Sequence, residues 1–359
     1  MKKIVNTKVL AIVLLVLSIS FTSCNRKKKT AVVADTVTVL AKEIKEVPIY
    51  REAIVFITGT DSKHSNYYTS AKTYFEEKQF EVVTEAYSLQ EIISWLNNNY
   101  DERLYSEIHI VSQNNPWKGM NLETVINGEI VNENTLRKSL INDELPKLHK
   151  GIADDTNVIF HSPTLANDVN LIQGLKNVFS TTKQPKIVST QYYTIFGGQF
   201  SKYYLAKPYY GFYPTAHSPG KVDLSKEFAK NYPNEKDIDW LETLYNESER
   251  YVGEAFTTQF NLPIKMEIDF TDSDNEVPTL NSQEKIMDFI EANENLTNEF
   301  NTYNIDIEKF RWKASVKDSK LTIKGITTVL CVLKPIIKPY GDLQHVEPEI
   351  DNLRLYTIN

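Results

Sequence analysis

Two short runs of sequence decide how this chain is interpreted: EIHIVSQN at residues 107–114 and NVIFHSP at residues 157–163. Each run is largely apolar over the length of a β-strand and ends in small or polar residues. Strands that are apolar throughout are typical of a parallel sheet that is covered on both faces. The two runs therefore predict neighbouring buried strands whose carboxyl ends meet, and that edge is where such sheets place functional residues.

The same pattern continues on both sides of these runs. Ser88 followed by Glu91 forms a capping box that predicts a helix start, and the Asn-Gly pair at residues 127–128 predicts a β-hairpin within residues 120–134. Strands that alternate with helices predict an α/β fold, here a mostly parallel sheet with helices on both faces over residues 51–205. Further strands are predicted at residues 53–59, 80–84 and 186–190, and helices at residues 67–78, 136–149 and 168–180.

The first 24 residues have the composition of a targeting segment. A basic start precedes an apolar run at residues 9–19, which is short for a membrane span. The run ends in Phe-Thr-Ser-Cys, and the small residues before Cys24 resemble the lipobox of bacterial lipoproteins, whose cysteine is acylated and becomes the first mature residue. The resemblance implies a signal peptide at residues 1–23 and a lipidated tether and linker at residues 24–50. An uncleaved N-terminal membrane anchor is the alternative.

The tether begins with a basic run, Arg-Lys-Lys-Lys at residues 26–29. Cations beside a lipid anchor lie among anionic headgroups, where each contributes about 1 kcal/mol of binding. Lipoproteins that are exported to the cell surface have an acidic pattern at these positions, and this run departs from it. The segment therefore predicts a protein that is lipid-anchored in the bacterial cell envelope and faces the periplasm.

Composition excludes several classes of protein. Hydrophobic residues make up 41% and charged residues 24% of the 359 residues, which excludes a wholly disordered chain. The 40 basic and 47 acidic residues give a net charge of −7, so no general basic face indicates a nucleic-acid partner. Two cysteines form no disulfide framework. The sequence lacks P-loop, HExxH, G-x-S-x-G and CxxC motifs, and the acidic run at residues 269–276 lacks EF-hand spacing; neither a cofactor nor a metal is expected.

The two opening strands resemble, in order and spacing, those of the caspase-like (clan CD) cysteine peptidases. In that family one strand ends in His-Gly, a hairpin follows, and the next strand ends in the nucleophilic cysteine. The histidine takes or shares the thiol proton, and the thiolate attacks a carbonyl carbon. The resemblance covers about residues 50–200, under half of the chain. An unrelated α/β domain with flavodoxin-like strand order is the alternative.

Both halves of the catalytic dyad differ from the family pattern. Gln113 stands where the family has histidine, and Asn114 where it has glycine. Pro163 stands where the cysteine belongs, or Ser162 if the register shifts by one. A glutamine amide does not titrate, and proline has no nucleophilic atom. The resemblance thus implies a pseudo-peptidase, an envelope lipoprotein that acts as a binding or scaffold module for a peptide or protein partner.

An active hydrolase with a displaced serine is the alternative function. Ser162 is the best candidate nucleophile, and His64 or His161 would have to act as its base. His64 follows the first strand, at the same edge of the sheet. His161 is adjacent to Ser162 in sequence, and strand neighbours point to opposite faces. His109 lies between two isoleucines and is expected to be a buried core residue.

The remainder of the chain is less informative. Residues 206–262 are predicted to be an aromatic loop followed by a helical connection, and residues 263–359 a smaller, β-rich α+β domain. A helix is expected at residues 283–296, and Cys331 is expected to be a buried, unreactive thiol. The aromatic segment either binds a ligand or packs as a long connection. Its ligand-binding candidates are Tyr209, Tyr210 and Tyr213.

Overall fold

The computed structural model describes residues 49–62, 65–271 and 276–359. The predicted signal peptide, Cys24 and the tether therefore lie outside the described residues, as does His64. Within the described part, no helix is both long enough and apolar enough to cross a bilayer. The predicted mixed α/β class is confirmed, with eight α-helices and several sheets in these residues.

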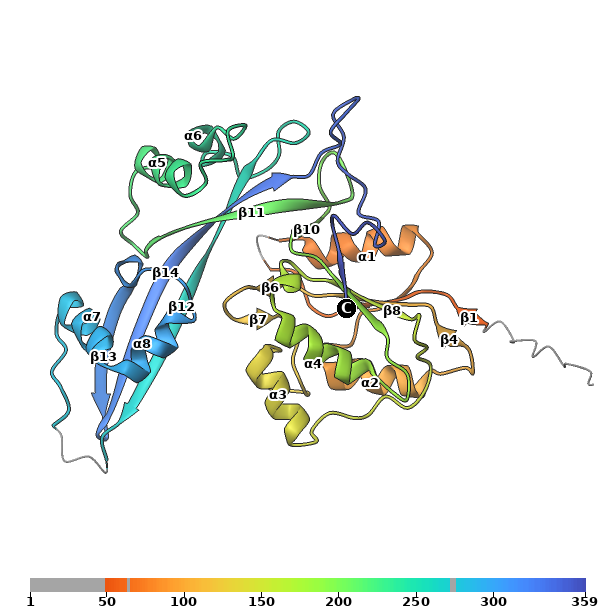
Figure 1. Ribbon diagram of the computed structural model, residues 1–359, viewed down its shortest axis with the longest axis horizontal. Helices are drawn as coiled ribbons and strands as arrows, with labels where there is room; N and C mark the ends of the chain where they lie inside the picture. Colours follow the sequence, from red (N-terminus) through yellow and green to blue (C-terminus); the bar gives the residue numbers. More distant parts are fainter. Residues whose placement is uncertain (1–48, 63–64, 272–275) are drawn as a thin grey trace, which may run out of the picture. The chain divides into compact units, whose positions relative to one another are not determined.

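The first sheet has five parallel strands and one short antiparallel edge strand, in the order β15-β9-β8-β5-β2-β3. Helices lie against both of its faces (Figure 1). Its strands are β2 (Ile54–Ile57), β3 (Glu81–Val83), β5 (Glu107–Val111), β8 (Asn157–His161), β9 (Lys186–Ser189) and β15 (Thr357–Ile358). Its helices are α1 (Tyr67–Glu77), α2 (Leu89–Asn98), α3 (Glu133–Ile141) and α4 (Val169–Phe179). Short strand pairs flank it: β1 (Tyr50–Arg51) with β4 (Leu104–Tyr105), and β6 (Asn114–Asn115) with β7 (Gly119–Met120).

Alternate residues of the central strands belong to two separate cores. Ile110 and Phe160 pack among residues of α2, α3 and α4, whereas Val111 and Ile159 pack against α1. Both faces of each strand are therefore apolar, which is why the strands appear in the sequence as continuous runs. The predicted pairing of residues 107–112 with residues 157–161 is confirmed, because Ile110 lies opposite Phe160 on adjacent parallel strands.

Local signals set several element ends. The Ser88 hydroxyl accepts from the Glu91 amide, so the predicted helix start is confirmed. The Glu91 carboxylate accepts from the Ser88 hydroxyl and the Tyr87 amide, whereas a capping box requires the Ser88 amide. The predicted helix at residues 136–149 is wrong in its second half: α3 ends at Ile141, and Pro146 could not continue it. The predicted hairpin at residues 120–134 is reduced to a single bridge between residues 123 and 130.

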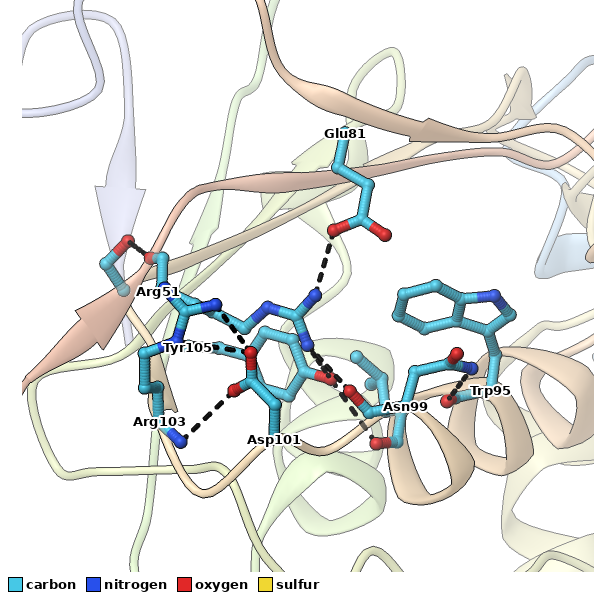
Figure 2. Close-up of polar contacts among 9 residues, drawn as sticks. Arg51, Glu81, Trp95, Asn99, Asp101, Arg103 and Tyr105 are labelled. Atoms are coloured by element: carbon cyan, nitrogen blue, oxygen red, sulfur yellow. Dashed lines mark hydrogen bonds and ion pairs between the residues drawn. The ribbon is translucent and has the colours of Figure 1, made fainter.

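Arg51 ties the amino end of the first sheet to the elements around it (Figure 2). Its guanidinium donates to the Asn99 carbonyl at 2.8 Å and to the Tyr105 hydroxyl at 3.3 Å, and it forms an ion pair with Glu81 at 2.9 Å. It also lies over the Tyr105 ring, 4.9 Å from the centroid. The Arg51 side chain is only 10% exposed, so its charge is held in place by several partners at once.

A second sheet is antiparallel, in the order β10-β11-β14-β12, and β13 also pairs with β14. α5 and α6 pack on one face of this sheet, around Tyr213 and Leu330. α7 and α8 pack on the other face, around Ile264 and Ile323. The strands are β10 (Tyr193–Phe196), β11 (Tyr203–Pro214), β12 (Phe256–Asp269), β13 (Arg311–Lys317) and β14 (Lys320–Pro335). The helices are α5 (Lys221–Asn231), α6 (Trp240–Thr243), α7 (Gln283–Ala292) and α8 (Glu294–Asn301).

The predicted aromatic loop is wrong, because its residues form the long strand β11. The predicted boundaries after residues 205 and 262 consequently fall inside β11 and β12. Gly211, inside this strand, is required by packing: a Cβ at this position would lie 2.6 Å from the Phe228 ring of α5. The predicted helix at residues 283–296 is divided into α7 and α8 at Asn293, whose side chain caps α8.

The prolines of β11 are tolerated because they lie on a free edge. The Leu205 carbonyl accepts a hydrogen bond on the β14 side, so odd-numbered residues of β11 turn their backbone groups toward β14. Beyond the end of β10, even-numbered residues face the open edge, where Pro208 and Pro214 lose no ladder bond. The Tyr232 hydroxyl accepts from the amide of Tyr210 and donates to its carbonyl, at 2.9 Å each, and so satisfies the open edge at this residue.

Candidate functional site

The carboxyl ends of β5 and β8 meet at one edge of the first sheet, as the sequence predicts. The Asn114 side-chain amide donates to the Pro163 carbonyl at 2.8 Å. The two strand ends that carry the family-matched positions are therefore in direct contact. A hydrogen bond from the Ser112 amide to the His161 carbonyl, at 3.4 Å, joins them one step earlier.

A short hairpin, β6 with β7, follows Gln113 directly. Asn114 pairs with Met120 and Asn115 with Gly119, and Gly119 adopts a positive φ of 107°. The tip residue Trp117 donates from its ring nitrogen to the Tyr303 carbonyl at 3.0 Å. The hairpin borders two hollows of about 670 and 680 Å³.

The larger hollow has few charged side chains in its lining, whereas Lys118, Glu133 and Asp168 line the smaller one. In the larger hollow, Lys118 and Glu247 are the only Lys, Arg, Asp or Glu side chains among the described lining residues. Trp117 packs edge-on against Tyr210 and Phe212, with centroids 5.1 and 5.7 Å away, and supplies an aromatic wall beside the smaller one. The larger lining combines aromatic and apolar residues with seven side-chain amides: Asn66, Gln113, Asn114, Asn115, Asn121, Gln259 and Asn261.

Gln113 is held by hydroxyl groups. Its backbone amide donates to the Tyr68 hydroxyl at 3.0 Å, and its side-chain amide donates to the Ser65 hydroxyl at 3.4 Å. The Tyr68 hydroxyl also accepts from Asn121 at 3.2 Å, and burial raises the pKa of Tyr68 above 10. The position that the family gives to its histidine therefore has an amide that is hydrogen-bonded to hydroxyl groups.

Ser162 is fully buried, and its hydroxyl has no hydrogen-bond partner in the described residues. His161, its neighbour, points to the opposite face of β8, among α1 and β11 residues. The structure therefore does not bring the serine and this histidine together. Pro163, the other family-matched position, is held through its carbonyl by Asn114.

His161 belongs to a buried chain of hydrogen bonds that the sequence did not reveal. Its Nε2 lies 2.9 Å from His109 Nδ1, and its Nδ1 lies 3.0 Å from the Tyr203 hydroxyl. The chain continues from Tyr203 to the Tyr356 hydroxyl at 2.8 Å, and from His109 to the Glu107 carboxylate at 3.2 Å. Burial, with a smaller contribution from His109, lowers the pKa of His161 well below 6.5. His109 is buried, as expected.

Thr164 is a second residue that sequence reasoning missed. It adopts a left-handed backbone, φ 59° and ψ 9°, which is strained for a β-branched residue. Its hydroxyl is buried without a partner in the described residues, and the residue lines the smaller hollow. Strained backbone is often found at functional sites, so the strain and the unsatisfied hydroxyl directly after Pro163 make this strand end a candidate site. No feature of the sequence predicts a positive φ at this threonine.

The three candidate tyrosines have different surroundings. Tyr209 and Tyr213 are buried against α5 and α6 and belong to the core of the second sheet. Tyr210 lies on the opposite face and lines the larger hollow, and its hydroxyl is buried without a partner in the described residues. Of the three, only Tyr210 is placed to meet a ligand.

The described residues contain no group of three or more His, Cys, Asp or Glu side chains that could hold a metal ion. Cys331 is fully buried, and burial raises its pKa far above 9. A scan of the chain against protein-family models finds no matching family. No curated protein matches the chain significantly.

Proposed function

We propose that this chain is a non-catalytic binding lipoprotein of the bacterial envelope, whose first α/β part is a degenerate caspase-like peptidase domain. The observation that carries the proposal is the junction of β5 and β8. The family-matched positions touch each other there through Asn114 and Pro163, and neither position supplies a nucleophile or a base. Binding surfaces survive the loss of such a dyad, because strand edges and pockets bind without nucleophiles.

Three further features support descent from that fold. β5 and β8 are adjacent and parallel, as the family order requires. A β-hairpin follows Gln113 directly, at the place where the family has one. Thr164 has a strained backbone immediately after the position of the family's cysteine. The strand order of the sheet is also that of flavodoxin-like domains, so the hairpin and the strand ends carry the preference for the caspase-like origin.

The alternative, a hydrolase with a displaced serine, has less support. Ser162 is fully buried, and its hydroxyl meets neither a base nor any other partner in the described residues. A nucleophilic serine needs a base within about 3.2 Å to remove its proton. His161 faces the other side of the sheet, and its depressed pKa leaves it neutral within a chain of its own.

The two hollows beside the β6–β7 hairpin together form a cleft, and its lining favours an uncharged peptide segment as ligand. Amide side chains both donate and accept hydrogen bonds, so several of them can match the alternating amides and carbonyls of an extended backbone. Trp117 and Tyr210 add rigid aromatic area, which dominates binding energy at many interfaces. One lysine and one glutamate in the larger hollow supply no strong field for a charged ligand.

The wild-type chain is expected to retain peptides from a random displayed library without cleaving them. Trp117→Ala should weaken the retention of selected peptides by about tenfold or more, because it removes a central aromatic contact. Tyr245→Ala is the matched control, since Tyr245 is an aromatic residue that is 62% exposed outside the cleft. Retention is measured by titration, and cleavage by mass spectrometry of the same peptides.

Two results would contradict this proposal. Peptide turnover that Ser162→Ala abolishes would establish the displaced-serine hydrolase. Selected peptides that bind Trp117→Ala as tightly as they bind the wild type would show that the cleft around the hairpin is not the binding site.

A further inference from the structure

The lower part of the second sheet carries three lysines in one row. Lys324 of β14 lies directly opposite Lys265 of β12 on one side and Lys313 of β13 on the other. All three side chains are exposed. Neighbouring strands are about 4.8 Å apart, and like charges that lie directly opposite each other destabilise a sheet. The row therefore costs stability, which indicates a role outside folding.

The next row toward α5 adds a fourth cation, Arg311, beside Ile326 and Pro263. In the described residues, Arg311, Lys313 and Lys324 form no ion pair with a carboxylate, whereas Glu267 pairs with Lys265 at 2.6 Å and with Lys320 at 3.1 Å. These two lysines hold the pKa of Glu267 at about 2. The chain as a whole has a net charge of −7, so this face is a local positive surface on an acidic protein.

This face of the sheet is open. The opposite face is covered by α7 and α8, whose Ile290 and Phe300 pack with Trp312 and Ile323 (Figure 1). On the basic side, α5 and α6 pack around Tyr213 and Leu330, and they do not extend to the row of lysines. Below them lies a hollow of about 620 Å³, lined by the four cations together with Thr215, Pro263 and Ile326.

We propose that this basic face docks on an anionic lipid bilayer and contacts the phosphates of its headgroups. An open sheet face presents its cations in one layer, which suits a planar array of phosphates better than a single small anion. Lysine ammonium groups are compact point charges, which suit phosphates that differ in position. The exposed Pro263 and the half-buried Ile326 lie among the cations and can enter the interface. The surface is separate from the cleft at β5 and β8, and it does not depend on the proposed function of that cleft.

The test uses the chain from residue 25 onward, which lacks both the signal segment and the lipid-bearing cysteine. Both sheets are complete in this chain, because all of their strands lie between Ile54 and Ile358. Co-sedimentation is measured with vesicles of phosphatidylcholine alone, and with vesicles of equal parts phosphatidylcholine and phosphatidylglycerol. The wild type is expected to bind the anionic vesicles, to lose this binding as salt increases, and to bind the neutral vesicles weakly.

The decisive variant is the triple substitution Lys265→Gln, Lys313→Gln and Lys324→Gln. Each cation at an anionic surface strengthens binding about fivefold, so the triple variant should bind about 100-fold more weakly. It should fold at least as well as the wild type, because it removes like charges that face each other. The matched control changes the same amount of charge on exposed lysines elsewhere and should bind as the wild type does: Lys72→Gln, Lys138→Gln and Lys147→Gln.

Several outcomes would overturn the proposal. Equal losses of binding in the two triple variants would show that net charge, and not the basic face, causes the effect. Equal binding to neutral and anionic vesicles would show that the contact is not electrostatic. Competition by inorganic phosphate at a matched phosphate concentration would make the ligand a soluble anion. Retention on immobilised polyglutamate, without binding to vesicles, would replace the membrane by an acidic protein partner.

Discussion

Phe160→Ala is expected to lower the free energy of unfolding by about 3–5 kcal/mol. Phe160 is fully buried in the middle of β8, and its ring meets Phe179 of α4 edge-on, with centroids 6.2 Å apart. On the neighbouring strand it faces Ile110, which is also fully buried. The surrounding strands and helices cannot collapse into the space, so the substitution leaves a cavity as well as removing apolar contact.

Urea unfolding, followed by circular dichroism, measures the effect. Phe200→Ala is the matched control: Phe200 is 38% exposed, and its replacement should change stability by no more than about 0.5–1 kcal/mol. A loss below 1 kcal/mol at Phe160 would mean that β8 is not a central strand. The same variant should leave vesicle binding unchanged under conditions in which it remains folded, because the basic face lies on the other sheet.

The first sheet was predictable because burial on both faces leaves a distinctive sequence. The run at residues 157–161 coincides with β8, since Val158, Ile159 and Phe160 have to be apolar whichever face they point to. The Ser88 cap was equally readable, because its hydrogen bonds join residues only three apart. Contacts this local, and cores this continuous, can be inferred without knowing the rest of the fold.

The prediction for the second sheet was wrong because its strands are defined by contacts between segments that are distant in sequence. Pro208 and Pro214 suggest a loop unless their strand is known to have an open edge, and that edge exists because β10 pairs only with residues 203–206 of β11. The basic row is similarly hidden, since Lys265, Lys313 and Lys324 come together only through strand register. The net charge of the whole chain, −7, gives no indication of such a row.

The candidate site was predictable in position but not in chemistry. Sequence order placed Gln113 and Pro163 at neighbouring strand ends, and the Asn114 bond to Pro163 agrees with that. The strained backbone of Thr164 and the aromatic wall at Trp117 had no local signal. Both arise from how the chain turns after a strand, which depends on neighbours that are distant in sequence.

The buried histidine chain leads to a prediction about pH. A neutral imidazole has one donor and one acceptor nitrogen, so the hydrogen bonds from Tyr203 through His161 to His109 have to run in one direction. The groups that face His161 supply no negative charge: they are the His109 ring, the Tyr203 hydroxyl and the Tyr67 hydroxyl, which bonds its carbonyl. A protonated His161 would therefore be buried without a counter-ion, and its pKa lies well below 6.5.

Acid should destabilise the fold through this residue. The unfolded chain protonates His161 below about pH 6.5, whereas the folded chain keeps it neutral, so the unfolded state binds more protons. The stability contributed by the neutral ring is complete above pH 6.5 and is lost as the pH falls from there toward the pKa of the folded state. The expected slope is about 1.4 kcal/mol per pH unit for this one group.

Replacing the ring separates this effect from every other titration. His161→Phe should cost about 2–3 kcal/mol near pH 8, because it leaves His109 Nδ1 without its partner and the Tyr203 hydroxyl with one bond fewer. Below pH 6.5 it should lose about 1.4 kcal/mol per pH unit less than the wild type does. His161→Gln, which keeps one hydrogen-bonding group at the site, should show the same loss of slope at a smaller cost.

Urea unfolding between about pH 5 and pH 8 gives the comparison. His149→Gln, at an exposed histidine, is the control and should retain the steep wild-type slope. The buried pair of His345 and Glu249 is present in all of these chains, so its contribution cancels. If both His161 variants keep the wild-type slope, the acid sensitivity comes from other groups. In that case the folded protein protonates His161 about as readily as the unfolded protein does. The series of hydrogen bonds from Glu107 to Tyr356 would then have to hold a buried proton.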